Sequence, residues 1–250
     1  MDEKELKKSW KKEEKSFFEG WDFSYLKNRW IDEEPSWDYM EMAKSLVRKS
    51  KSILDMETGG GERFSSLAPF PKHVVAFEGY KPNVAVARRR LRPFGIKVFE
   101  VTDVPLPFKD GEFDLILNRH GAINEQILKE VFRILKPKGI FLTQQVDGEN
   151  MKDFMKYFGV KPKWPKNTLR VVRKNMKKIG FKIKKGKSWK GKQIFKDVGA
   201  IVYYLKAIPW TVDDFSVNKH FNILMKFQKK LEKGGELVFS SRRFFILAEK

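Results

Sequence analysis

ILDMETGGGE, residues 53–62, is the stretch of the chain from which the fold follows. A short apolar run breaks directly into three glycines, and such a turn lets backbone approach a ligand at the carboxyl end of a buried strand. No Gly-Lys-Ser/Thr follows, which excludes a phosphate-binding P-loop, and the G-x-G-x-x-G spacing of dinucleotide-binding folds is absent. A tight turn without a ligand is the alternative at this point.

Strand and helix patterns alternate downstream of the glycines. Apolar or alternating runs predict strands, and longer periodic runs between them predict helices. The predicted strands are 53–56, 74–77, 96–101, 113–117 and 140–143, and the predicted helices are 83–91 and 124–135. This order favours an α/β fold with a Rossmann-like, doubly wound, mainly parallel sheet of seven strands, the last antiparallel.

Both ends of the chain extend this core. Helical patterns over 3–19 and 37–49 predict an N-terminal helical cap over residues 1–50. The remaining residues, 51–250, then form one domain. In this domain a helix over 168–179 and a strand over 181–185 precede a helical insertion at about 191–240, and residues 244–248 form the last strand.

Acidic residues follow the predicted strands where a ligand would lie. Glu78 ends the second strand, 17 residues after Gly61, and a carboxylate there can accept two hydrogen bonds from a ribose. Asp103 follows the third strand, where it can reach the exocyclic amine of an adenine. A Leu-Pro-Phe stretch (106–108) then leads into Phe113-Asp114.

Together with VFRILKPKG (131–139), these elements resemble the class I S-adenosylmethionine-dependent methyltransferase family, in particular its methyltransferase type 11-like branch. The resemblance covers about residues 50–147. It implies S-adenosyl-L-methionine as cofactor, with Gly59 and Gly61 against its methionine part, Glu78 on the ribose and Asp103 on the adenine. The full implied cofactor-binding set is Asp55, Glu57, Thr58, Gly59, Gly60, Gly61, Glu78, Gly79, Tyr80, Thr102, Asp103, Val104 and Asn118.

Glu57 departs from the family pattern. The family has Asp-x-Gly-x-Gly-x-Gly, and Glu57 stands at the first glycine. Its side chain either crowds the cofactor or bonds the cofactor's ammonium. A cofactor-binding protein without catalysis is therefore one alternative.

The segment after the fourth strand, Asn118-Arg119-His120-Gly121, carries the catalytic candidates. The chain has no cysteine nucleophile and lacks the Asp/Asn/Ser-Pro-Pro-Tyr/Phe sequence of relatives that methylate nucleobase amino groups. We expect a methyltransferase acting on O or N of a small molecule, without a metal. His120 is the candidate general base and Arg119 the candidate contact to an anionic or aromatic acceptor. Structural roles for both residues are the alternatives.

The net charge of +20 is unevenly distributed. Residues 161–196 carry fifteen Lys or Arg and no acid. This block suits an anionic partner, so an RNA methyltransferase docking through it is the second alternative, although a solvated surface explains the block equally. Nucleic acid is not the favoured partner. No apolar membrane span or secretory signal is recognisable, and we expect a basic, cytoplasmic, monomeric protein.

Overall fold

The computed structural model describes residues 2–18 and 21–250. They divide into two compact units. One comprises residues 1–35, 148–165 and 190–242, and the other residues 36–147, 166–189 and 243–250. We call the first the aromatic unit and the second the sheet unit. The predicted division at residue 50 and the predicted insertion at 191–240 stay predictions, and Glu19, where the first predicted helix ends, lies outside the described residues.

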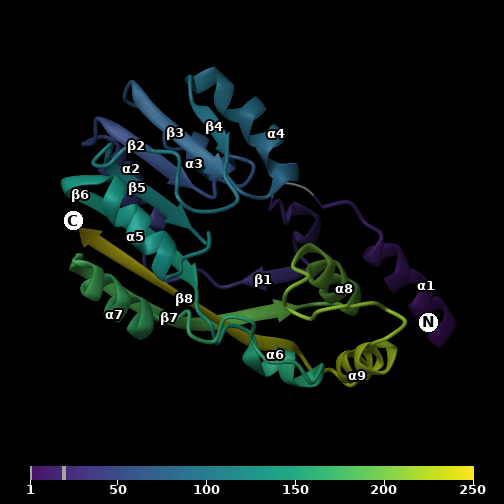
Figure 1. Cartoon of the computed structure of the whole chain (residues 1–250). Coiled ribbons are helices and arrows are strands. Elements are labelled where there is room, and N and C mark those ends of the chain that lie inside the picture. Colours follow the sequence, from purple (N-terminus) through teal and green to yellow (C-terminus); the bar gives the residue numbers. More distant parts are fainter. Residues whose placement is uncertain (1, 19–20) are drawn as a thin grey trace. The chain divides into compact units, whose positions relative to one another are not determined.

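Parallel strands make up the centre of the sheet unit (Figure 1). They are β2 (Ser52–Met56), β3 (His73–Glu78), β4 (Lys97–Glu100), β5 (Phe113–Arg119) and β6 (Leu135–Val146). All five residues of β2 are buried, which explains its apolar sequence, because helices cover both faces of a parallel sheet. The register pairs Met56 with Phe77 on one side and with Asn118 on the other, so three strands end at one edge.

The strand order is β1-β7-β8-β6-β5-β2-β3-β4. The last strand, β8 (Leu237–Glu249), pairs antiparallel with β6, as predicted. The sheet has eight strands rather than the predicted seven, because β1 (Trp30–Asp32) pairs antiparallel with β7 (Lys182–Phe195). A run of only three residues is too short to show alternation, so sequence periodicity could not reveal β1.

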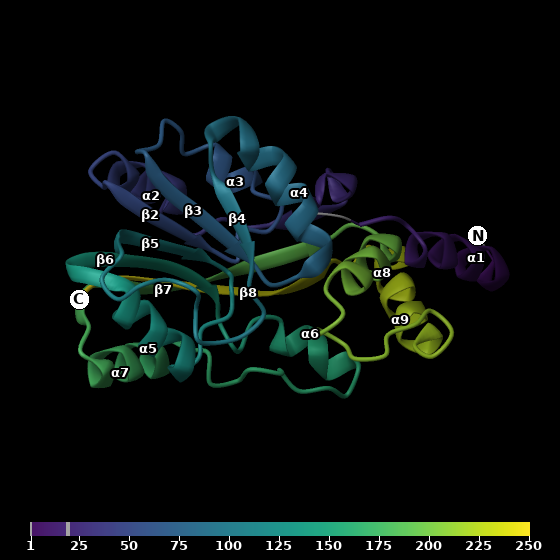
Figure 2. The ribbon, with the colours of Figure 1, turned by 45° about the horizontal axis from the view of Figure 1, so that its top comes forward.

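Helices cover both faces of the sheet unit (Figure 2). On one face, α2 (Tyr39–Val47), α3 (Glu62–Ser65) and α4 (Lys81–Leu91) pack with Ile53 and Leu115 in one core cluster. On the other face, α5 (Glu125–Ile134) and α7 (Leu169–Ile179) pack with Leu54 and Ile116. Asn124 and Thr168 cap α5 and α7 as their sequences suggest, since each side chain accepts a backbone N–H of the first turn.

Two family-like motifs act as structural ties in this unit. Asp114 accepts backbone N–H bonds from Lys51 and Ser52, and Lys136 Nζ lies 3.0 Å from its carboxylate. Arg133 donates to the carbonyls of Leu106 and Phe108 at 3.0 and 2.8 Å. The Leu-Pro-Phe stretch is therefore held by α5.

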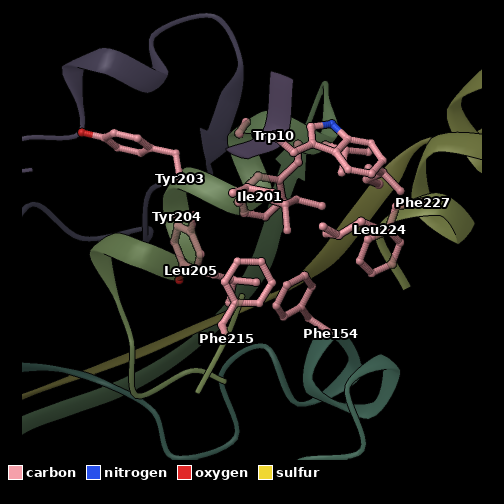
Figure 3. Close-up of a cluster of buried hydrophobic side chains, with 14 of the residues drawn as sticks. Trp10, Phe154, Ile201, Tyr203, Tyr204, Leu205, Phe215, Leu224 and Phe227 are labelled. Atoms are coloured by element: carbon pink, nitrogen blue, oxygen red, sulfur yellow. The ribbon is translucent and has the colours of Figure 1, made fainter. Parts of the chain in front are cut away.

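The aromatic unit contains the remaining elements: α1 (Glu3–Glu14), η1 (Ser24–Leu26), β1, α6 (Lys152–Tyr157), α8 (Val198–Ala207) and α9 (Phe221–Glu232). Its core is shown in Figure 3, where Phe154 and Phe227 lie beside residues of α8. Nine of the ten residues of α8 are buried, so this helix is the centre of the unit. Arg29 forms ion pairs with Glu13 of α1 at 2.8 Å and with Asp197, the residue before α8, at 2.7 Å.

Phe154→Ala should strongly destabilise the aromatic unit. Phe154 is fully buried and its ring lies 4.8–6.4 Å from the rings of Phe158, Phe195, Phe227 and Phe239. Truncation should lower the free energy of unfolding by about 3–5 kcal/mol, measured by urea denaturation. Phe17→Ala, at a side chain that is 79% exposed, is the matched control and should change it by less than about 0.5 kcal/mol. Equal effects of the two changes would contradict this core assignment.

Candidate functional site

The carboxyl ends of β2, β3 and β5 bring most of the predicted cofactor residues together. Residues 57–61 follow β2, residues 79–80 follow β3, and Asn118 lies near the end of β5. The backbone N–H of Thr58 donates to the carbonyl of Phe77 at 3.1 Å, so pairing between β2 and β3 continues into the loop. Thr102, Asp103 and Val104 follow β4, the next strand along, and Thr102 and Asp103 are exposed.

Glu78 is the best-anchored acid of the edge. Only 2% of the residue is exposed, and its two carboxylate oxygens accept the backbone N–H groups of Gly59 at 2.6 Å and Tyr80 at 2.7 Å. Burial raises its pKa despite these bonds. Glu78 thus joins the loop after β2 to the turn after β3.

Two further acids lie beside it. Burial raises the pKa of Asp55 to about 7, and burial together with the charge of Glu78 raises the pKa of Glu57 to about 7. Glu57 has a φ of 54°, the left-handed region that favours glycine. Its Oε2 lies 3.4 Å from the backbone nitrogen of Gly79.

Gly61 adopts a backbone conformation and a close packing that only glycine allows. Its φ is 81°, and an added Cβ would lie 2.9 Å from Cγ of Leu91, which is fully buried. The backbone N–H of Gly61 closes the turn by donating to the carbonyl of Thr58. The glycine therefore allows both the turn and the close packing of α4.

A buried polar network orients Asn118. Its Oδ1 accepts from Thr143 Oγ1 at 3.1 Å and from Gln145 Nε2 at 2.6 Å, and both partners belong to β6. Its Nδ2 consequently turns away from them. That atom is buried and has no hydrogen-bond partner among the described residues, as is also true of the Tyr39 hydroxyl and Thr58 Oγ1.

His120 lies just beyond β5 with its orientation fixed by two other side chains. Trp37 Nε1 donates to Gln144 Oε1 at 2.7 Å, and Gln144 Nε2 lies 3.1 Å from His120 Nε2. An indole N–H can only donate, so the Gln144 oxygen faces Trp37 and its amide donates to His120. His120 Nε2 is therefore an acceptor, and the ring proton of the neutral form sits on Nδ1.

Positive charge surrounds the same ring. Solvent reaches the His120 side chain, yet the protein packed around it and the charges of Arg119, Arg243 and Arg63 hold its pKa well below 6.5. His120 is thus neutral at pH 7. The candidate acceptor contact Arg119 is half-buried at the end of β5.

Sequence reasoning missed several residues of this site. Thr143, Gln144 and Gln145 form the network described above, and Arg63 and Arg243 add charge near His120. The polar Thr-Gln-Gln run that follows the apolar residues 140–142 of β6 was the available signal, because buried polar side chains require partners.

Known proteins resemble this arrangement. Residues 54–143 match the model of the methyltransferase domain family. A demethylmenaquinone methyltransferase of Thermus thermophilus is 34% identical over 112 residues, which cover 41% of this chain and 50% of that protein. A ubiquinone/menaquinone biosynthesis C-methyltransferase of Pseudoalteromonas translucida is 32% identical over 117 residues, 42% of this chain and 47% of that protein. The chain thus spans about half the length of the curated relatives it matches.

Solved structures share the fold. A methyltransferase candidate from Bacillus halodurans superposes with a TM-score of 0.62 at 18% identity, covering 84% of this chain and 98% of that one. The YcgJ protein of Bacillus subtilis gives 0.59 at 15% identity, covering 85% and 97%. None of the helices among residues 2–18 and 21–250 has the length and apolar character needed to cross a membrane. Over residues 54–143 the chain therefore matches the methyltransferase domain family, and the solved structures share its fold.

Proposed function

We propose that the chain is an S-adenosylmethionine-dependent methyltransferase for a small molecule, with the cofactor over the carboxyl ends of β2, β3 and β5. The observation that carries this proposal is the unpartnered Asn118 Nδ2, buried beside the glycine loop and held in place by Thr143 and Gln145. A buried donor without an acceptor costs about 1–3 kcal/mol. A polar ligand that accepts its proton would remove that cost.

The residues of this edge fit the groups of S-adenosylmethionine. Asn118 Nδ2 and the Tyr39 hydroxyl are buried donors without an acceptor among the described residues, and they suit the cofactor's α-carboxylate. The ionised forms of Asp55, Glu57 and Glu78 suit the cofactor's ammonium, its sulfonium and its ribose hydroxyls. Asp103 is placed by its bond from the backbone N–H of Val104 and stays the proposed adenine contact.

The cofactor supplies an activated methyl group on a positively charged sulfur, so the protein's task is to align an acceptor and exclude water. His120 presents its Nδ1–H rather than a free lone pair, because Gln144 already donates to Nε2. It therefore suits the orientation of an acceptor oxygen better than the removal of a proton. The charges of Arg63, Arg119 and Arg243 favour an acceptor that is anionic or becomes so.

Two assignments of the acceptor atom follow from different observations. The sequence predicts O or N of a small molecule, and that stays a prediction. The matched relatives are named demethylmenaquinone methyltransferase and C-methyltransferase, which favours carbon of an activated ring. A panel of phenols, quinols and amines incubated with methyl-labelled cofactor distinguishes these cases by the position of the label.

The alternatives make different demands. An RNA substrate would require the basic 161–196 block to bind, with affinity that falls steeply as salt is added. A non-methylating role is also compatible with the fold, since the [4+2]-cyclase SpnF superposes with a TM-score of 0.52 at 15% identity, covering 88% of this chain and 84% of that one. The predicted monomer and cytoplasmic location stay predictions.

Glu78→Gln should weaken cofactor binding. At pH 8 we expect the dissociation constant of S-adenosylmethionine to rise about 10- to 100-fold, because hydrogen bonds to a charged acceptor are lost. Calorimetry measures the change, with NAD as a ligand that should not bind.

Glu100→Gln is the matched control. Glu100, at the end of β4, pairs in register with Glu78 but is exposed. Removal of its charge should leave the affinity for S-adenosylmethionine unchanged. Unchanged affinity in a folded Glu78→Gln protein would remove Glu78 from the ribose site.

His120 should stay neutral down to low pH. We expect an NMR titration of labelled histidine to place its midpoint well below 6.5. Because the unfolded chain binds that proton more readily, His120 should make the free energy of unfolding fall as the pH drops below about 6.5, and His120→Asn should reduce this slope. A midpoint at or above 6.5 would contradict the assignment of a depressed pKa to His120.

A further inference from the structure

The Glu57 side chain lies between the ends of three strands. An added Cβ at Gly79, after β3, would lie 3.4 Å from Glu57 Oε1, and one at Gly121, after β5, would lie 2.5 Å from Glu57 Cβ. Gly121 thus leaves room for this side chain, and Gly79 lies in van der Waals contact with it. The acid therefore occupies the space above β2 and between β3 and β5.

This placement has an energetic cost. The left-handed region is sterically unfavourable for residues other than glycine, and Glu57 adopts a φ of 54° there. The carboxyl is also mostly desolvated beside Glu78. Interactions that the side chain makes must offset both costs.

The Glu57 carboxyl lies in hydrogen-bonding contact with that of Glu78. Two carboxylates in contact repel each other unless one of them holds a proton, and burial with the charge of Glu78 raises the pKa of Glu57 to about 7. A carboxylate has about four acceptor positions. In Glu78 the N–H groups of Gly59 and Tyr80 use two, and Glu57 takes one of those that a ribose diol would need.

Other ionisable groups surround the pair. Asp55 belongs to β2 itself and acts electrostatically on both Glu78 and Tyr39, which comes from α2. From the end of β5, Arg119 and His120 face the same edge, and His120 is neutral at pH 7. Asp55 is therefore a second group that titrates near neutral pH, and the test must separate it from Glu57.

We propose that Glu57 and Glu78 share one proton and that this proton gates the cofactor site, an inference that rests on the proposed function. While Glu57 donates to Glu78, the ribose hydroxyls cannot occupy that acceptor position. Cofactor binding breaks the bond between the two carboxyls and releases the proton to solvent. Both carboxylates are then charged, with the ribose hydroxyls donating to Glu78 and the cofactor's cationic groups near Glu57.

Proton release fixes the sign of the pH dependence. The bound state holds fewer protons, so affinity rises with pH until Glu57 is ionised in the free protein. With a pKa of about 7, binding of S-adenosylmethionine should be about tenfold weaker at pH 6 than at pH 8.

Two variants separate the gate from its surroundings. Glu57→Gly removes the side chain and suits the left-handed backbone, so binding should be tight and equal at pH 6 and pH 8. Glu57→Gln keeps the size and always donates to Glu78, so binding should be weak and equal at both values. Asp55 and Glu78 are present in both variants, so any pH dependence that remains in them belongs to these two acids.

Calorimetry in buffers of different ionisation enthalpy counts the protons directly. At pH 6 the wild-type protein should release about one proton on binding, and both variants should release none. Equal affinities of the wild-type protein and Glu57→Gly at pH 6, with no proton released, would overturn the gate alone. Absence of binding in all three proteins at pH 8 would overturn the proposed function itself.

Discussion

The bonds that Glu78 accepts from Gly59 and Tyr80 are the interaction on which the candidate site depends. Three parallel strands end at the same edge, and these bonds hold the loop after β2 to the turn after β3. A carboxylate buried to 2% exposure is costly unless it accepts hydrogen bonds, and the two backbone N–H groups provide them. The same two hydrogen bonds therefore stabilise the buried carboxylate and fix the conformation of the glycine loop.

Much of the sheet unit could be predicted from the sequence because its signals are local. Buried parallel strands have continuous apolar runs, and Asn124 and Thr168 start their helices with capping side chains. The structure confirms these elements, although β6 extends from Leu135 to Val146, well beyond the predicted strand over 140–143. Asp114 and Arg133, which belong to the family-like motifs, serve as ties of backbone segments away from the glycine loop.

The packing of the aromatic unit could not be predicted from the sequence, because the residues in contact are far apart in the chain. Strand β1 exists through pairing of Trp30 with Phe195, and Arg29 joins Glu13 to Asp197. The helix α6 is six residues long and packs Phe154 against residues from β7, β8 and α9. Periodicity over a window of a few residues contains no information about such partners.

At the candidate site, the residue types were predictable and their connections were not. Glycines and acids after strands indicate where a ligand lies, whereas the orientation of Asn118 depends on Thr143 and Gln145 in a neighbouring strand. The position of Glu57 was recognised as a departure from the family pattern. Its contact with Glu78 follows only from the path of the backbone.

The contact between Trp37 and Gln144 makes His120 sensitive to a remote segment. Trp37 precedes α2, and its ring is held 4.9 Å from that of Phe245 in β8. While the indole stays there, the glutamine amide cannot turn over, and the imidazole is restricted to one tautomer. Undocking of the tryptophan would let the amide rotate and exchange donor for acceptor at His120 Nε2. The packing of the Trp37 ring thereby determines the tautomer of His120, although the two side chains share no hydrogen bond.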